Sequence, residues 1–351
     1  MTPRDDDLAG DGAVSNGGGS IGRTGLVTEV NSGRELLSLA DPLVAGAGAG
    51  AGDAPSGSSR LPEGGQATGR GSVLRLTALT FIENRLAIWG LGILVFMALF
   101  CFVGPLIYHT NQTTLNPAFS NYGPSLSHPL GTDNEGFDVL GRLMVGGQSS
   151  LEIGLAVGVV AVIFGSLYGA VAAVAGGAVD AVMMRIVDGL FSIPTLFLLI
   201  ILGDIYTPNV PLLIIVLSLL SWLGTARLVR GEALSLRTRE FVQAVKVAGG
   251  SQRRVVIRHL IPNTIGTIMV TASFIVADSI LVLATLGFLG FGLPSPAADW
   301  GQMLSNGVTY LFDGYWWQLY PAGIAIVLTV VAFNLIGDAL RDSLDARLQR
   351  R

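Results

Sequence analysis

The sequence predicts an all-α membrane protein that crosses the bilayer about six times. Its composition is far more apolar than that of a soluble globular domain, with 50% hydrophobic residues, 13% charged residues and a mean hydropathy of +0.60. Several long stretches lack Asp, Glu, Lys and Arg, and they reach the length of about 20 residues that a helix needs to cross the hydrocarbon core. The basic residues gather in alternate connections between these stretches, which is typical of polytopic membrane proteins.

The two ends of the chain are expected to lie outside the membrane domain. Residues 1–71 are rich in Gly, Ala and Ser and have no sustained apolar period, so they predict a disordered cytoplasmic tail. Acidic residues and Gly follow Met1 closely, which argues against a secretory signal peptide. Residues 72–85 are expected to form a short interfacial helix, and residues 346–351 a basic cytoplasmic C-terminus. The membrane domain is therefore expected within residues 86–345.

Six stretches of this domain are candidate spans. Four of them contain no charged residue, namely 86–108, 153–179, 205–226 and 314–337. The shorter stretch 189–203 is expected to begin near Ala181, and another span is expected at about 260–291. This last span contains Asp278, which costs roughly 2.5 to 3.5 kcal/mol at the bilayer centre. Each neighbouring Leu, Ile, Val or Phe favours insertion by about 0.3 to 0.6 kcal/mol, so the segment can still insert.

The distribution of basic residues predicts that both termini are cytoplasmic. With six spans and an inner N-terminus, all but one of the 21 Lys and Arg residues fall on the inner side, the exception being Arg142. The opposite orientation would reverse this distribution, against the positive-inside rule. We therefore expect a multi-pass protein of the plasma (inner) membrane, with an outside loop at 109–150 and an inside loop at 227–263.

The inside loop carries the most informative motif. Residues 240–251 read Glu-Phe-Val-Gln-Ala-Val-Lys-Val-Ala-Gly-Gly-Ser, and residues 258–263 read Arg-His-Leu-Ile-Pro-Asn. This segment resembles the EAA loop of ATP-binding-cassette (ABC) importer permeases, in which E-A-A is followed by three residues, G, nine residues and I-x-L-P. The residues at the matching positions are Gln243, Ala244, Val245, Gly249 and the run from His259 to Pro262. The spacing is intact, while Gln, Val, His and Ile depart from the strict consensus.

The residue types in this loop fit a contact with another protein. Val242, Val245 and Ala248 recur at helical spacing and predict a short helix with an apolar face that enters a groove on a partner. Gly249-Gly250 allows the backbone to turn sharply, and Pro262 marks the expected re-entry into the membrane. The alternative is a basic loop held only by lipid headgroups.

Further segments resemble the dipeptide and oligopeptide importer permeases. Residues 128–140 read His-Pro-Leu-Gly-Thr-Asp-Asn-Glu-Gly-Phe-Asp-Val-Leu, like the H-P-L-G-T-D-x-x-G-x-D-V-L signature that precedes the second helix of that family. Residues 288–304 and 337–345 resemble the stretches after the fifth helix and at the C-terminal end. The resemblance covers the chain from about Phe81 onward and leaves the long N-terminal tail unassigned.

The resemblance implies a permease subunit of the binding-protein-dependent transport inner membrane component family, with a six-helix fold of the methionine-importer type. It implies a second, similar permease, two ATPase subunits and an extracytoplasmic substrate-binding protein as partners. Together the two permeases would form the pathway for dipeptides or oligopeptides. The residues implied in ATPase coupling are Glu240, Gln243, Ala244, Val245, Gly249, Gly250 and Pro262.

ATP and Mg are expected on the partner subunits, and this chain is not expected to be an enzyme. Lys246 is the only lysine and is followed by Val247, so the sequence has no G-x-x-x-x-G-K-[ST] phosphate loop. Nucleic acid is not an expected partner, because basic residues form no long run and the net charge is -4. His109, His128 and His259 fall on different sides of the membrane, so we expect no metal cluster and no bound cofactor.

Three carboxylates are candidate functional residues. Asp278 lies well inside a span, where charge usually faces a pathway or a subunit interface, although a satisfied structural role is the alternative. Asp133 and Asp138, with Glu135 between them, are candidate contacts of the outside loop for the binding protein, although turn formation alone can explain them.

Three other functions stay open at this point. Nickel or other small solutes are possible substrates, because permeases of nickel importers resemble those of peptide importers. An ion-coupled secondary transporter would need charged relays within the membrane, and only Asp278 supports this interpretation. An intramembrane hydrolase is opposed by the positions of the histidines.

Overall fold

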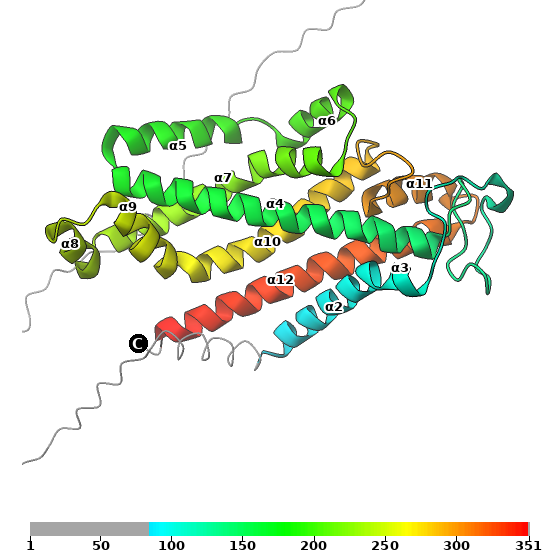
Figure 1. The fold of residues 1–351 in the computed structure, drawn as a ribbon, viewed down its shortest axis with the longest axis horizontal. Coiled ribbons are helices and arrows are strands. Elements are labelled where there is room, and N and C mark those ends of the chain that lie inside the picture. The colour runs from blue at the N-terminus through cyan, green and yellow to red at the C-terminus, as the bar shows by residue number, and fades with distance from the viewer. Residues whose placement is uncertain (1–83, 350–351) are drawn as a thin grey trace, which may run out of the picture. The chain divides into compact units, whose positions relative to one another are not determined.

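The described part of the chain is built of helices. The computed structural model describes residues 84–349, where the only β-type pairing is an isolated bridge between Thr132 and Asp138 (Figure 1). Five helical segments are long and apolar enough to cross a membrane, and a bent pair of shorter helices brings the number to six if it counts as one span. The predicted all-α fold with about six spans is therefore confirmed. The predicted tail at 1–71 and most of the interfacial helix at 72–85 lie outside the described residues.

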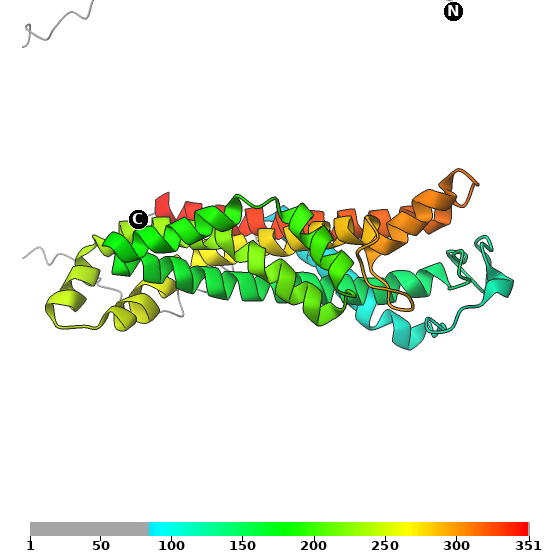
Figure 2. The same cartoon turned by 90° about the horizontal axis from the view of Figure 1, so that it is seen from above.

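The helices follow each other closely except at residues 108–138, a longer connection that contains one short 3-10 turn. In chain order they are α2 (Arg85–Phe102), α3 (Gly104–Ile107), η1 (Pro117–Phe119), α4 (Val139–Ala175), α5 (Gly177–Phe191), α6 (Thr195–Ile205), α7 (Val210–Arg237), α8 (Glu240–Val247), α9 (Gln252–Val255), η2 (Val256–Leu260), α10 (Ile261–Phe288), α11 (Trp300–Leu311), η3 (Trp316–Gln318) and α12 (Tyr320–Gln349). Figures 1 and 2 show α8 and α9 at one end of the bundle, and α11 with residues 109–138 at the other. We call these the α8 end and the α11 end.

Both predicted loops are shorter than expected, because the neighbouring helices extend beyond their uncharged stretches. The side chain of Asp138 accepts a hydrogen bond from the Gly141 N–H and starts α4 at Val139, so residues 139–150 are helical. At the other end α7 runs to Arg237 and the next helix begins at Gln252, which leaves 238–251 as the connection. An uncharged stretch ends at the first charged residue, whereas a helix continues as long as its backbone N–H and C=O groups can form hydrogen bonds.

The span expected to begin near Ala181 is a broken helix. α5 already begins at Gly177, and α5 and α6 meet at an angle of 71°. Pro194 stands directly before α6 in an extended conformation, and proline has no N–H to continue the helical hydrogen bonds of α5. The physical cause of the break is therefore visible in the sequence.

Helix α4 is the central element of the bundle, because α7 and α10 pack against different parts of it (Figure 1). Two glycine pairs with the spacing G-x-x-x-G make these contacts close. A Cβ added at Gly154 or Gly158 would come within 2.5 Å of Ile280 or 2.4 Å of Val276 on α10. A Cβ added at Gly169 would lie 2.3 Å from the carbonyl oxygen of Ala226 on α7. Small residues that allow helix backbones to approach are the usual basis of helix association in membranes.

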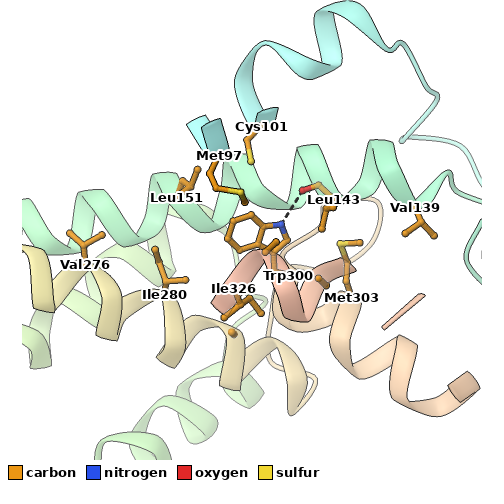
Figure 3. Close-up of a cluster of buried hydrophobic side chains, with 13 residues drawn as sticks. Met97, Cys101, Val139, Leu143, Leu151, Val276, Ile280, Trp300, Met303 and Ile326 are labelled. Carbon is orange, nitrogen blue, oxygen red and sulfur yellow. Dashed lines mark hydrogen bonds between the residues drawn. The ribbon is translucent and has the colours of Figure 1, made fainter. Parts of the chain in front are cut away.

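Near the α11 end, Trp300 is the centre of a buried cluster (Figure 3). Its ring is 0% exposed and packs with Met97, Cys101 and Leu151, which come from α2 and α4. The indole N–H donates a hydrogen bond to the carbonyl oxygen of Leu143 at 3.0 Å, so the polar atom of this large ring is satisfied. The cluster therefore fixes the first turn of α11 against α4.

We predict that Gly169→Ala destabilises the protein. The added methyl group would overlap the backbone of α7, and overpacking of this kind typically costs about 1 to 3 kcal/mol. Gly224→Ala is the matched control, because a Cβ at this helical glycine meets nothing within 4 Å and alanine favours the helix. Thermal unfolding of the purified protein in detergent checks this, and equal melting temperatures for the two variants would contradict the close contact.

Candidate functional site

At the α8 end, a short connection carries the segment that sequence analysis singled out. α8 stands between α7 and α9, and its first residue, Glu240, is exposed in the first turn, where a negative charge is favourable. Val242 is 0% exposed and packs against Val229 and Ala233 of α7. This buried side chain holds α8 against the bundle.

The structure corrects the predicted partner-facing side of α8. Val242 and half-buried Val245 pack on the chain's own core, so they are not free to enter a groove on another protein. The outward side presents Gln243, Ala244 and Val247 instead, and Val247 is 89% exposed. A short amphipathic helix has one apolar side, and here that side covers α7 and α9.

The two glycines end α8 as expected from their residue type. Gly249 has a φ of +75°, a conformation that favours glycine, and a Cβ at this position would meet nothing within 4 Å. The Gly250 N–H donates a hydrogen bond to the carbonyl oxygen of Val245 at 2.8 Å, which closes the end of the helix. Ser251 then accepts a hydrogen bond from the Arg254 N–H and starts α9. The turn leaves Gly249 exposed at the surface.

Pro262 lies beyond this connection, as the second residue of α10. The helical segment runs without interruption from Gln252 to Phe288, and Pro262 falls inside it. The residues just before it, Val256–Leu260, form a π-helical turn, in which the Ile261 N–H donates to the carbonyl oxygen of Val256. The wider turn fits a proline, which cannot donate a hydrogen bond and crowds the preceding turn.

At the α11 end, Asp138 is held by three groups. Its Oδ1 accepts from the Gly141 N–H at 2.8 Å, while its Oδ2 accepts from the Tyr108 hydroxyl at 2.9 Å and lies 2.9 Å from His128 Nδ1. Burial, followed by the hydrogen bond to Asp138 and its negative charge, raises the pKa of Tyr108 to about 12. Asp138 is 4% exposed and serves as the N-cap of α4.

Arg142, also buried, organises the rest of this end. Its guanidinium lies 3.5 Å from a carboxylate oxygen of Asp133 and 3.6 Å from one of Glu135, and over the ring of Phe137 at 4.3 Å. It also donates to the carbonyl oxygen of Pro296 at 3.4 Å. Burial raises the pKa of Asp133, against the effect of the Phe137 and Glu135 N–H groups and of Arg142. The arrangement joins the connection before α4 to the one before α11.

These contacts correct the prediction for Asp133 and Asp138. Both side chains are buried within the chain, so neither is available to a binding protein on this surface. The alternative explanation, that these two aspartates stabilise turns and helix starts, fits their contacts better. A surface hollow of about 370 Å³ lies beside Asp138, and its rim exposes Leu115 and Phe119.

Asp299 performs a similar structural task for α11. It is 0% exposed, and its two carboxylate oxygens accept from the N–H groups of Gln302 and Leu293, each at 2.9 Å. Burial raises the pKa of Asp299, although these two N–H donors, that of Gly301 and the charge of Arg142 act against the rise.

Within the membrane, Asp278 is exposed on the surface of α10. It belongs to the apolar span Gln252–Phe288, and none of the ion pairs found among the described residues includes it. Within the same part of the chain, no three His, Cys, Asp or Glu side chains gather as a metal site would require. The three regions with unusual chemistry are therefore the α8 connection, the α11 end and the Asp278 side of α10, and they lie apart along the helices.

Sequence reasoning missed two features. Glu232 of α7 accepts a hydrogen bond from the Thr267 hydroxyl of α10 at 3.1 Å, while its other carboxylate oxygen is buried without a hydrogen-bond partner. Its position two residues after Arg230 and between Arg227 and Arg237 led to its interpretation as part of a charged loop. The glycine pairs of α4 were visible as two G-x-x-x-G patterns in an apolar stretch and could have indicated the packing.

Comparison with known sequences supports the motifs. A family described as "Binding-protein-dependent transport system inner membrane component" matches residues 161–350, and one described as "N-terminal TM domain of oligopeptide transport permease C" matches residues 72–124. The first match spans the α8 connection and Asp278, and the second includes part of the outside connection.

Curated relatives resemble the chain over most of its length. The oligopeptide transport system permease protein OppC of Escherichia coli (strain K12) is 40% identical over 269 residues, which cover 76% of this chain and 89% of OppC. The dipeptide transport system permease protein DppC of Bacillus subtilis (strain 168) is 36% identical over 268 residues, 76% of this chain and 84% of DppC. A putative peptide transport system permease protein of Brucella abortus is 38% identical over 274 residues, 78% of this chain and 92% of that protein.

We predict that Arg142→Gln destabilises the α11 end. Removing the cation leaves Asp133 and Glu135 without their charge partner, and breaking a buried ion pair costs about 3 kcal/mol. The matched control is Arg227→Gln, because Arg227 and its partner Asp188 are 45% and 50% exposed and such pairs contribute about 1 kcal/mol or less. Thermal unfolding and protease cleavage between residues 109 and 138 provide the measurements. Similar effects of both variants would show that Arg142 does not organise this end.

Proposed function

This chain belongs to the family of binding-protein-dependent transport system inner membrane components, and from this premise we propose that it is a permease subunit of an ATP-driven peptide importer. Its substrates are dipeptides or oligopeptides, which is the substrate class named for its relatives. Five or six membrane-spanning helices agree with a role as a conduit.

We further propose that it works in a complex. A second, similar permease completes the pathway, two ATPase subunits bind at the α8 end, and an extracytoplasmic binding protein delivers the peptide at the α11 end. ATP and Mg bind to the ATPases. The predominance of basic residues on one side supports an orientation in which the α8 end and both termini are cytoplasmic.

The exposed side of α8 is the observation that carries this proposal. α8 is anchored by buried Val242, while Gln243, Ala244 and Val247 face outward, and no residue of the described part of the chain covers apolar Val247. Exposed Arg253 and Arg254 of α9 stand close by and can pair with carboxylates of a partner. A short exposed helix side with small and apolar residues, beside two arginines, fits a groove on an ATPase subunit.

The binding protein would meet a different surface from the one expected from the sequence. Asp133 and Asp138 shape the α11 end from within, and the rim of the hollow beside them offers Leu115 and Phe119 to a partner. Exposed apolar side chains at a polar surface often mark an interaction site. These residues therefore replace the two aspartates as the proposed contacts.

We predict that Gly249→Arg prevents association with the ATPases. A side chain at a φ of +75° strains the turn, and the long cation would project from the surface that we assign to the ATPase. Tagged protein is purified from cells that co-express candidate ATPase subunits, with membrane insertion verified, and the yield of ATPase per permease is measured. We expect a loss of about tenfold or more.

The matched control is Gly314→Arg. Gly314 has a φ of +93° and open space around it, but it lies between α11 and η3 at the opposite end. This variant should keep its ATPases. Equal loss in both variants would assign the effect to backbone strain, and absence of ATPases from the wild type would favour an ion-coupled transporter instead.

A further inference from the structure

We propose that a polar track on α10 lines the transport pathway and that Asp278, within this track, selects positively charged peptides over negatively charged ones. The track consists of Thr267, Thr271, Asp278 and Thr285, together with Glu232 at its inner end. This inference rests on the proposed function as a peptide permease and adds a charge preference to it.

The depth of Asp278 excludes a position at the membrane surface. It stands 10 residues before Phe288, where α10 ends, and 15 residues after Asn263. At a rise of 1.5 Å per residue these distances are about 15 and 22 Å. A carboxylate on a short side chain cannot reach either surface, and its exposure to lipid would be costly. Exposed Asp278 must therefore face a partner or a water-filled space.

The side of α10 that carries Asp278 points away from the core. Val276 and Ile280 lie against Gly158 and Gly154 of α4, as the glycine contacts show. Asp278 is two residues from each of them, a rotation of about 200° around a helix with 3.6 residues per turn. Asp278 therefore points almost directly away from α4.

Threonines lie on the same side of α10 as Asp278, both before it and after it. Thr271 and Thr285 stand seven residues before and after Asp278, a spacing that returns to the same side of a helix. Their hydroxyls donate to carbonyl oxygens of their own helix, Thr267 and Leu281, each at 2.8 Å. The acceptor sites of both hydroxyl oxygens remain available outward. From Thr271 to Thr285 the track spans about 21 Å, most of the hydrocarbon thickness.

The inner end of the track carries a second carboxylate. Thr267 lies on the same side of α10, one turn before Thr271, and its hydroxyl donates to Glu232 Oε1 at 3.1 Å. Oε2 of Glu232 is buried and has no hydrogen-bond partner within the described residues. The polar surface therefore continues from α10 onto α7 toward the α8 end.

The charge of the track identifies the class of ligand that it favours. It contains two carboxylates, and neither belongs to an ion pair found among residues 84–349. The nearby arginines of α7, Arg227 and Arg230, are directed to Asp188 and Asp180 of α5. Acidic groups along a narrow passage raise the local concentration of cations and repel anions. Peptides with Lys or Arg side chains are the cations that a peptide pathway would carry.

Composition distinguishes this surface from a lipid-facing or tightly packed one. Close helix interfaces in membranes use small residues, as α4 does, and lipid-facing surfaces are apolar. Three hydroxyls and an exposed carboxylate recur along this side, with apolar Phe274 and Leu281 in the turns between them, and this mixture matches neither pattern. It fits a water-filled passage, where polar side chains are solvated.

The test measures the charge preference of the complete transporter in proteoliposomes. The same binding protein delivers Ala-Lys-Ala or Ala-Glu-Ala at saturating concentration, and the ratio of their initial import rates is recorded for the wild type, Asp278→Asn and Asp278→Lys. We expect the ratio to fall about tenfold in Asp278→Asn and further in Asp278→Lys, while the neutral peptide Ala-Ala-Ala is still imported by Asp278→Asn. Glu152→Gln is the matched control, since Glu152 is an exposed carboxylate of α4 outside the track and its removal should leave the ratio unchanged.

The possible outcomes separate the two proposals. An unchanged ratio in both Asp278 variants would overturn the selectivity role. Loss of all import together with loss of the second permease on purification would also overturn it and would place Asp278 in the subunit interface. If the wild type imports none of the three peptides although its ATPases hydrolyse ATP, the proposed peptide substrate is wrong, and the charge preference for peptides falls with it.

Discussion

The close approach of α4 to two neighbours is the constraint on which the rest of the fold depends. One glycine pair opens its backbone to α10 and a second pair, eleven residues further along, opens it to α7. Since both contacts exclude even a methyl group, α4, α7 and α10 have fixed distances at these points. Lipid offers no hydrophobic drive for helix association, so this close packing is the main source of cohesion in the bundle. The broken α5–α6 pair is attached by buried Val187 and Leu199, which pack on α7, and by ion pairs from Asp180 and Asp188 to arginines of α7.

The same helix also determines the architecture of the α11 end. α4 begins eight residues before the first glycine contact with the Trp300 ring, at Gly147, and Asp138 provides the cap for that start. Arg142, one turn into α4, neutralises part of the negative charge of the preceding connection. Asp299 and Trp300 then attach α11 to the same stretch of α4 through a cap and a hydrogen-bonded indole. Asp133, Asp138 and Asp299 therefore hold this end together from within, and the apolar rim beside Asp138 is an exposed feature that a binding protein can recognise.

Sequence reasoning succeeded where the physical signal was local or periodic. It failed where the outcome depended on which part of the fold a side chain packs against. The spans, the turn at Gly249 and the family followed from apolar length, residue type and motif spacing. The helix ends at Val139 and Arg237 did not follow from the sequence. Charged residues such as Arg142 were treated as loop residues, although tertiary contacts pair their charges within the helix. The direction of Val242 and the burial of Asp133 also required the fold, since a helix with an apolar side can turn it inward or outward. Asp278 was recognised by its depth, whereas its alignment with Thr271 and Thr285 became meaningful only once the side facing α4 was known.

The continuity of the segment from Gln252 to Phe288 has a mechanical consequence. The surface proposed for the ATPases and the polar track that contains Asp278 are joined by one helix, with α9 at one end and the track along the other part. Helices transmit displacement along their axis much better than loops do. The π-helical turn at Val256–Leu260 and Pro262 lie between the two regions, and such turns are where a helix bends most easily. Beyond them, Gly154 and Gly158 hold α10 to α4. A movement of α8 would therefore reach the track as a bend about the π-helical turn rather than as a separation of α10 from α4, so access to the pathway can change while the packed core of the bundle stays intact.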